Sequence, residues 1–215
     1  MRLIWNMELS QAIYPALQSV EVALRNGIHA AGTARFGAPD WFRDPAVLRL
    51  QRREQQMLDR ATDQIWERQG HSPGAIRKGT MLPPSLPAVD DHVAEMMFGF
   101  WTGLLNAPYQ RLLWGTRPGG VNLTAAAFPH AGRRDRQRAV IFPLVNRQRY
   151  LRNRVSHHEP IWNWRPSLAD AHRETLMVLG WVSPALLAVT TLMDPFPAIY
   201  ARGHGYCSGL LQLSP

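Results

Sequence analysis

The chain contains very little cysteine or lysine and no long apolar run. Cys207 is the only cysteine, so no internal disulfide can form, which fits a reducing cytoplasm. Lys78 is the only lysine among 24 basic residues, so the positive charge is carried by arginine. No segment reaches the roughly 18 uninterrupted apolar residues of a membrane span, and the N-terminus lacks the apolar core of a signal peptide. We therefore expect a soluble, cytoplasmic protein that does not associate with a membrane.

Several other patterns are missing as well. No stretch alternates polar and apolar residues with a period of two, which argues against a β-sheet. No glycine-rich phosphate-binding or dinucleotide-binding motif occurs, so no cofactor is expected. The 215 residues are 46% hydrophobic and show no repeat or linker, which suits one well-buried core. We predict a single all-α domain over 1–215, with its core at about 8–203.

Apolar residues recur at helical spacing along most of the chain. The first helix is expected to start at an N-cap, Ser10, and to end before Gly37. The second is expected to run from about Pro45 to Gln69, with Gly70 as its stop. A Pro/Gly-rich loop at about 71–87 is longer than most structural loops. Aromatic and methionine side chains mark the segment after it as the most buried. The further helices are predicted at 89–105, 133–158 and 170–191.

Charge is concentrated in one region. The net charge is +8, and eight arginines lie between Arg133 and Arg154 against one acidic residue, Asp135. A cationic face of this density repels itself unless an anion neutralises it, which favours an RNA backbone as the partner. The alternative is a basic face that is merely solvated. The arginines expected to contact RNA are Arg133, Arg134, Arg136, Arg138, Arg147, Arg149 and Arg154.

The decapeptide 151–160 combines guanidinium, imidazole and carboxylate groups. Arginine suits phosphate, and imidazole exchanges a proton near neutral pH, so the pair can cleave a phosphodiester without a metal. Arg152 and His157 are five residues apart, about 140° on a helix, so they would not share one face. Pro160 disfavours helix at the preceding residue, so a fraying helix end is expected here. His158 falls on the apolar stripe, which leaves His157 as the better proton carrier.

This segment resembles the Arg-x4-His catalytic motif of HEPN-superfamily ribonucleases. The wider chain is similar to the Abi-like (abortive infection) branch of that superfamily, over roughly residues 8–203. The motif itself reads Arg152-Asn153, three residues, His157, followed by His158. Its ordered companions are 20–26 in the first helix, 36–42 after it, Phe98-Gly99-Phe100-Trp101 at mid-chain, 152–163, and Leu179-Gly180-Trp181.

The resemblance implies a HEPN-like helical bundle that forms a homodimer with a composite cleft at the interface. It implies metal-independent endoribonuclease activity in anti-phage defence or as a toxin, and a cognate protein or RNA antitoxin as a further partner. Carried over by position, Arg152 and His157 would be catalytic and Asn153 would orient the site. Residues in supporting positions are His158, Glu21, Arg25 and Asn26; the alternative for Glu21 and Arg25 is an intrahelical ion pair.

Other functions fit the residues less well but stay open. The same scaffold can bind RNA or regulate without cleaving it. A metal site built from the 157–159 segment with His130 or His92 lacks a third ligand at a defined spacing. Ser156 beside His157 lacks an acid to orient the base.

Overall fold

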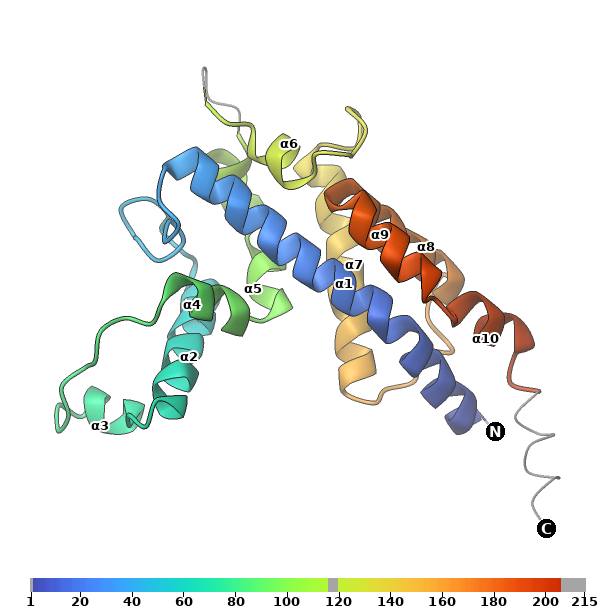
Figure 1. The fold of residues 1–215 in the computed structure, drawn as a ribbon, viewed down its shortest axis with the longest axis horizontal. Coiled ribbons are helices and arrows are strands. Elements are labelled where there is room, and N and C mark those ends of the chain that lie inside the picture. Colours follow the sequence, from blue (N-terminus) through green and yellow to red (C-terminus); the bar gives the residue numbers. More distant parts are fainter. Residues whose placement is uncertain (1, 116–119, 206–215) are drawn as a thin grey trace, which may run out of the picture. The chain divides into compact units, whose positions relative to one another are not determined.

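The fold is described from a computed structural model, which defines residues 2–115 and 120–205 (Figure 1). These residues form helices and connecting turns, with no strand among them, so the all-α prediction is confirmed. The helices are α1 (Arg2–Phe36), α2 (Arg52–Arg68), α3 (Pro73–Arg77), α4 (Val89–Glu95), α5 (Phe98–Gly103), the 3-10 turn η1 (Ala107–Tyr109), the π-helical turn η2 (Gln110–Trp114), α6 (Leu123–Ala127), α7 (Arg138–Ser156), α8 (Leu168–Val182), α9 (Pro184–Leu192) and α10 (Phe196–Arg202).

The chain divides into two compact units, and each is described by itself. The outer unit consists of residues 1–24 and 128–215, and the middle unit of residues 25–127. The long helix α1 contributes its first part to the outer unit and its last part to the middle unit.

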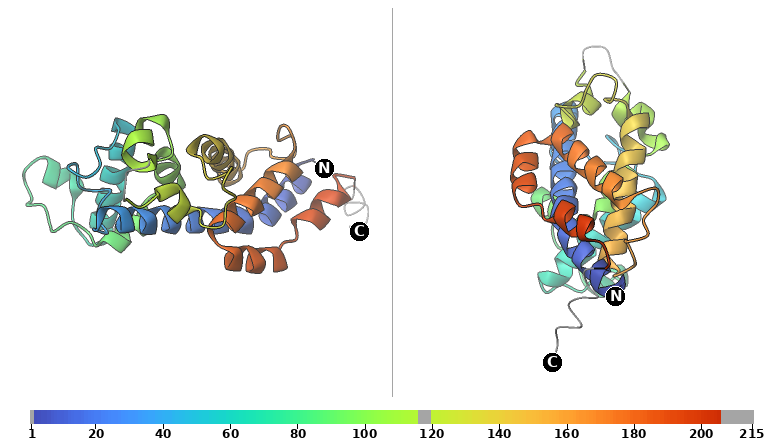
Figure 2. Two further views of the ribbon diagram at one scale, coloured as in Figure 1. Left: turned by 90° about the horizontal axis from the view of Figure 1, so that it is seen from above. Right: turned by 90° about the vertical axis from the view of Figure 1, so that its right-hand side faces the viewer.

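The outer unit has an aliphatic core between α1, α7 and the C-terminal helices. Leu9, Ile13 and Leu17 of α1 are fully buried against Leu151 of α7. Helix α7 also packs on α8, and α8 packs on α9 (Figure 2). The core is completed by Ala12, Val155, Ile161, Leu168, Ala171 and Phe196. Burial of these side chains removes them from water and fixes α7 against α1.

The middle unit has an aromatic core. The rings of Phe42 and Trp101 lie 5.9 Å apart edge to face, and those of Phe100 and Trp101 5.2 Å apart. Trp41 stands edge-on to Phe42 at 5.7 Å, and all four side chains have no measurable exposure. Such edge-to-face pairs add to the burial of apolar area. The segment 98–101 is therefore core, as the sequence predicts, and offers no surface for base stacking.

Several helix ends differ from the predicted ones. Gly37 and Gly70 follow α1 and α2 at φ values of 76° and 85°, so both predicted stops are confirmed. Ser10 lies inside α1, because the helix already begins at Arg2, so its prediction as an N-cap was wrong. The predicted loop at 71–87 contains a short helix, α3, capped by the Ser72 side chain. Helix α2 begins at Arg52, not near Pro45.

Two predicted helices are each split in two. Met96 and Met97 are extended between α4 and α5, with ψ values of 123° and 156°. Ser183 is extended because proline follows it, and its hydroxyl accepts a hydrogen bond from the Leu186 N–H that caps α9. The predicted helix at 170–191 is therefore α8 and α9.

Two buried histidines make the stability of the fold depend on pH. Burial, followed by the charge of Arg43, lowers the pKa of His92 from 6.5 to about 4. Burial also lowers the pKa of His172, although Asp194 at 2.8 Å opposes the shift. The unfolded chain takes up these protons before the folded one does, so the free energy of unfolding falls as pH decreases through this range.

We expect His92 alone to cost about 3 kcal/mol of stability between about pH 7 and about pH 4, at roughly 1.4 kcal/mol per pKa unit. Denaturant unfolding of the wild type and of His92→Gln across that range gives the free energy of unfolding at each pH. As pH decreases, this free energy should fall more steeply for the wild type than for the variant. An equal fall in both proteins would show that His92 does not titrate in this way.

Candidate anion-binding site in the outer unit

Helix α7 ends at a tight cap that exposes two histidines. His158 N–H donates to Val155 O at 3.1 Å, and Glu159 N–H donates to Arg154 O at 2.8 Å. This is the Schellman pattern, which requires left-handed backbone at the residue after the cap. Here that residue is His158, at a φ of 57°, where glycine is usual. The helix ends where it was predicted to end, but in an ordered cap and not by fraying; both His157 and His158 are exposed, so the prediction that His158 is buried was wrong.

A cavity of about 640 Å³ opens beside this helix end. Its α7 residues follow a spacing of three and four, which places them on one face of the helix. They are Arg147, Tyr150, Asn153, Arg154 and His157. Glu159, Trp164 and Arg165 of the following loop complete the lining. The cavity thus collects three guanidiniums and an imidazole beside aromatic and amide groups.

A buried asparagine of α1 holds that loop in place. Asn6 is 6% exposed, and its Oδ1 accepts hydrogen bonds from Ile161 N–H at 2.6 Å and Trp162 N–H at 3.4 Å. Its Nδ2 donates to Glu159 O at 3.3 Å. These contacts satisfy backbone groups that would otherwise be buried without partners. They fix the turn that returns Trp164 and Arg165 to the cavity.

Carboxylates neutralise two of the cavity arginines in this structure. Arg147 donates two hydrogen bonds to Glu174, at 3.0 and 2.7 Å. Arg154 donates to Glu159 at 3.1 Å and lies 5.9 Å from the Trp164 ring. Partly exposed ion pairs contribute little to stability, so a phosphate can replace either carboxylate at small cost. The cavity is therefore suited to binding an anion.

Arg152 lies outside this cavity and contacts α1. Its Nε and Nη2 atoms donate to the two carboxylate oxygens of Glu21, at 3.0 and 3.1 Å. The Arg152 and Glu21 side chains are 27% and 18% exposed. As expected from their spacing, Arg152 and His157 face different directions. Asn153 lines the cavity, and its backbone carbonyl accepts the His157 N–H at 2.9 Å.

The other residues proposed from the α1 patch belong to the middle unit. Arg25 donates from Nη1 to Ala94 O at 3.1 Å and from Nε to Asn26 Oδ1 at 3.4 Å. The Ala94 contact fixes the Arg25 side chain to the end of α4. Neither residue lines the cavity beside α7.

The arginines of the 133–154 run have different surroundings. Arg133 and Arg134 are exposed in the turn before α7. Arg136 donates to Ala131 O at 2.7 Å and Pro129 O at 2.6 Å, so it stabilises that turn. Arg138 lies 6.0 Å from the Phe142 ring. Arg149 donates to Asn146 Oδ1 and stacks 4.3 Å from the Tyr150 ring.

Four cavity residues were not predicted as site residues. Tyr150 was detectable, because it lies on the same helical face as Arg147, Arg154 and His157. Glu159, Trp164 and Arg165 come from an irregular loop whose path depends on Asn6, 153 residues away from Glu159 in sequence. No local pattern encodes that contact.

Two further findings bear on the alternatives. No cluster of three or more His, Cys, Asp or Glu side chains able to hold a metal ion occurs within residues 2–115 and 120–205. Across the same described ranges, no helix is both long and apolar enough to cross a lipid bilayer.

Comparison with known proteins gives no relative. No protein-family model, curated protein or solved structure matches the chain significantly. The case for function therefore rests on the cavity and on the motif in α7.

Proposed function

We propose that the chain is a metal-independent endoribonuclease whose reaction takes place in the cavity beside the end of α7. The observation that carries the proposal is the convergence of an exposed imidazole, His157, with three arginines in one cavity. Guanidinium groups bind phosphate bidentately, and imidazole transfers protons near neutral pH. The resemblance of the α7 motif to HEPN ribonucleases of the Abi-like type supports the same reaction.

In the proposed reaction, His157 takes the proton of a ribose 2′-hydroxyl. The 2′-oxygen then bonds to the adjacent phosphorus, and the bond from phosphorus to the 5′-oxygen breaks. A general acid protonates the departing oxygen, which gives a 5′-hydroxyl end and a 2′,3′-cyclic phosphate (or, after hydrolysis, a 3′-phosphate). Arg147, Arg154 and Arg165 bind the negative charge that develops on the phosphate. Asn153 orients the bound nucleotide.

Arg152 has a different part in this proposal. Its bidentate contact with Glu21 joins α7 to α1 and so sets the direction of the cavity face. It is a positioning residue, whereas the resemblance alone would make it catalytic.

The reaction also needs a general acid, and we propose that a second copy of the chain, in a homodimer, supplies it. One cavity contains a single histidine, and a second His157 from a symmetric copy would supply the second proton-transfer group. Light scattering should give a mass near twice 24.4 kDa for active protein. An enzyme that is active as a monomer at assay concentration would exclude the composite cleft.

The biological setting follows from the resemblance. We propose that RNA cleavage serves anti-phage defence or a toxin, held in check by a protein or RNA antitoxin. The second candidate is an RNA-binding protein without catalysis. It is favoured by the three arginines of the cavity, which can bind an anion even if no proton is transferred.

Purified protein incubated with total RNA in excess EDTA tests the proposal. Cleavage that persists and leaves 5′-hydroxyl ends is the expected result. Binding without cleavage supports the second candidate, and activity that disappears with EDTA and returns with zinc contradicts both.

The exposed arginines before α7 give a separate prediction for RNA binding. Replacing both Arg133 and Arg134 with glutamate should weaken binding and reduce its salt dependence, because fewer counterions are released from the RNA. Fluorescence anisotropy at several salt concentrations measures both effects. Arg136 is excluded because it stabilises its own turn. Arg173→Glu on α8, an exposed arginine outside the run that pairs with Asp170, is the control for one charge reversal elsewhere. Unchanged binding would show that this part of the run is only solvated.

A further inference from the structure

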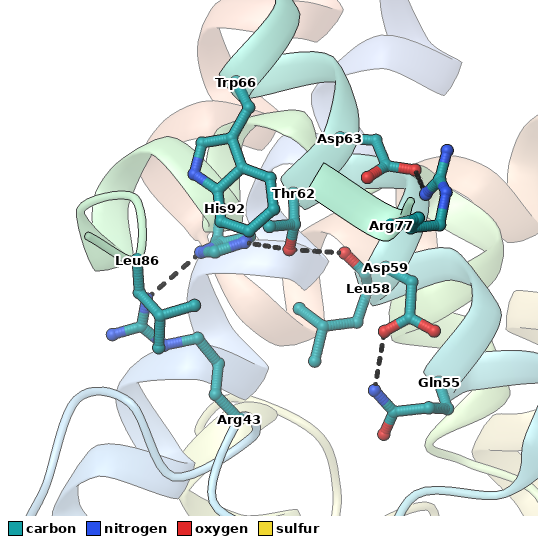
Figure 3. A pocket seen from close by; sticks show the side chains of 10 residues that line it. All are labelled: Arg43, Gln55, Leu58, Asp59, Thr62, Asp63, Trp66, Arg77, Leu86 and His92. Atoms are coloured by element: carbon teal, nitrogen blue, oxygen red, sulfur yellow. Dashed lines mark hydrogen bonds and ion pairs between the residues drawn. The ribbon is translucent and has the colours of Figure 1, made fainter. Parts of the chain in front are cut away.

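The middle unit contains a second cavity, which the proposed ribonuclease reaction does not use. It measures about 430 Å³ and lies along one face of α2 (Figure 3). That face contributes Gln55, Leu58, Asp59, Thr62, Asp63 and Trp66. Arg43, Arg77, Leu86 and His92 close the other sides. The volume suits a small organic molecule.

The protonation state of His92, which forms one wall of the cavity, follows from its contacts. Arg43 Nη1 lies 3.1 Å from His92 Nδ1, and because arginine only donates, that nitrogen must accept. The other ring nitrogen, Nε2, therefore carries the proton and donates to Thr62 Oγ1 at 2.8 Å. Thr62 in turn donates to Leu58 O at 2.9 Å. His92 is thus a neutral, fully hydrogen-bonded part of the wall.

The charges around the cavity balance. Two guanidiniums, Arg43 and Arg77, stand against two carboxylates, Asp59 and Asp63. Arg77 and Asp63 form an ion pair with each other at 2.5 Å. A ligand with a net charge would therefore gain attraction from one group and repulsion from another, which favours an uncharged ligand.

Two polar groups can still bind such a ligand. The Asp59 carboxylate is hydrogen-bonded by the neutral amide of Gln55 at 2.9 Å, which leaves it acceptor capacity. Arg43 lines the cavity as well, and its guanidinium has more N–H groups than its contacts with Pro87 O at 2.7 Å and His92 Nδ1 at 3.1 Å use. Arg43 and Asp59 come from different sides of the cavity, with Leu58 between them (Figure 3). The cavity therefore offers an acceptor and a donor on either side of an apolar floor.

The remaining walls are apolar or aromatic. Leu58 is buried beneath the cavity, and Leu86 is 65% exposed at its edge. The Trp66 indole N–H donates to Ser85 O at 3.3 Å, so its polar edge is engaged and its ring lines the cavity. An aromatic ring of this kind stacks on flat ligands.

We propose that this cavity binds an uncharged, planar heteroaromatic base of the guanine type. The base would donate from its N1–H and 2-amino edge to Asp59 and accept from Arg43 at its O6 and N7 edge. Arginine donation to O6 and N7 and carboxylate acceptance from base N–H groups are common in nucleic-acid recognition. The ring would lie against Trp66 and Leu58. This inference does not rest on the proposed ribonuclease function.

Calorimetric titration with three nucleosides tests the proposal. Guanosine should bind best, and inosine more weakly because it lacks the 2-amino donor. Adenosine should bind at least about tenfold more weakly than guanosine, because it would place its N1 acceptor against the Asp59 carboxylate. Nucleosides without a phosphate are used so that the arginines of the outer unit contribute nothing to the signal.

Variants locate the binding. Asp59→Asn should lower guanosine affinity at least about tenfold and remove the preference over adenosine. Trp66→Leu should weaken all three nucleosides together. Asp90→Asn is the control, since Asp90 is exposed on α4 and does not line the cavity. Circular dichroism checks that each variant is folded. Absence of guanosine binding to the wild type, or binding that Asp59→Asn leaves unchanged, would overturn the proposal.

Discussion

Replacing His157 with alanine is expected to lower the single-turnover rate of RNA cleavage by about 10²–10⁴-fold, the usual contribution of a general acid or base. His157 is exposed at the C-cap of α7, and only its backbone N–H takes part in the cap. Stability should therefore change little. RNA affinity should also change little, because the arginines of the cavity stay in place. A rate loss without a binding loss identifies a proton-transfer role.

His158→Gly is the matched control for that variant. His158 occupies left-handed backbone, where glycine is unstrained, so this variant should gain about 0.5–1 kcal/mol of stability and keep its activity. Thermal unfolding measures the first effect, and the cleavage assay measures the second. If His158→Gly removed activity and His157→Ala did not, the assignment of the base would be wrong.

The second large effect is a difference between the alanine variants of Arg152 and Arg154, which lie two residues apart. Arg154→Ala should lower the cleavage rate by about 10²–10³-fold, as when one charge-stabilising donor is removed from a transition state. Arg152→Ala should mainly destabilise the outer unit, by about 1–3 kcal/mol, because it leaves the partly buried Glu21 carboxylate without this partner. Denaturant unfolding and single-turnover cleavage, measured on both variants, distinguish the roles.

A double variant sharpens the comparison. Glu21→Gln combined with Arg152→Ala removes the carboxylate charge that has lost its Arg152 contact and should recover part of the stability lost by Arg152→Ala. Activity should recover with it, because the role of Arg152 is to position α7. If folded Arg152→Ala loses cleavage at low temperature, and the double variant stays inactive, Arg152 contacts the substrate itself, as the family resemblance implies.

The sequence predicts the helical class and the core because these depend on local spacing. Apolar residues every three or four positions are enough to place Ile13 and Leu17 inside, and the aromatic content of 98–101 is enough to place that segment inside. Helix ends are predicted well where glycine supplies left-handed backbone, as at Gly37. They are missed where a single residue before a proline leaves the helix, as at Ser183.

The candidate site is only partly predictable from sequence. Helix geometry already predicts that Arg152 and His157 face different directions. In the structure Arg152 faces α1, where it donates to Glu21. The position of Trp164 and Arg165 in the cavity depends on Asn6, which is far away in sequence and accepts hydrogen bonds from the loop after α7. The ion pair of Arg147 with Glu174 is likewise a tertiary contact, across 27 residues, whereas Arg154 pairs with Glu159 only five residues further on.

Net charge alone also overstates how many arginines are available to a bound phosphate. Arg136 and Arg149 are used in local hydrogen bonds, to the turn before α7 and to Asn146. Only Arg147 and Arg154 of the predicted set line the cavity, and Arg165 joins them from outside the run. Because a guanidinium can donate to backbone carbonyls as well as to phosphate, the arginine count of a segment does not give its number of phosphate contacts.

The most direct test of the proposed chemistry compares two substrates that differ by one atom. An RNA oligonucleotide is cleaved in EDTA, its cleaved position is mapped, and a second oligonucleotide is made with a single 2′-deoxyribose there. If His157 activates the 2′-hydroxyl, the first is cut to a 5′-hydroxyl product, and the second is bound with similar affinity but left intact at that position. Cleavage of the deoxy-substituted bond would contradict the account, because the nucleophile would then have to be something other than the ribose hydroxyl.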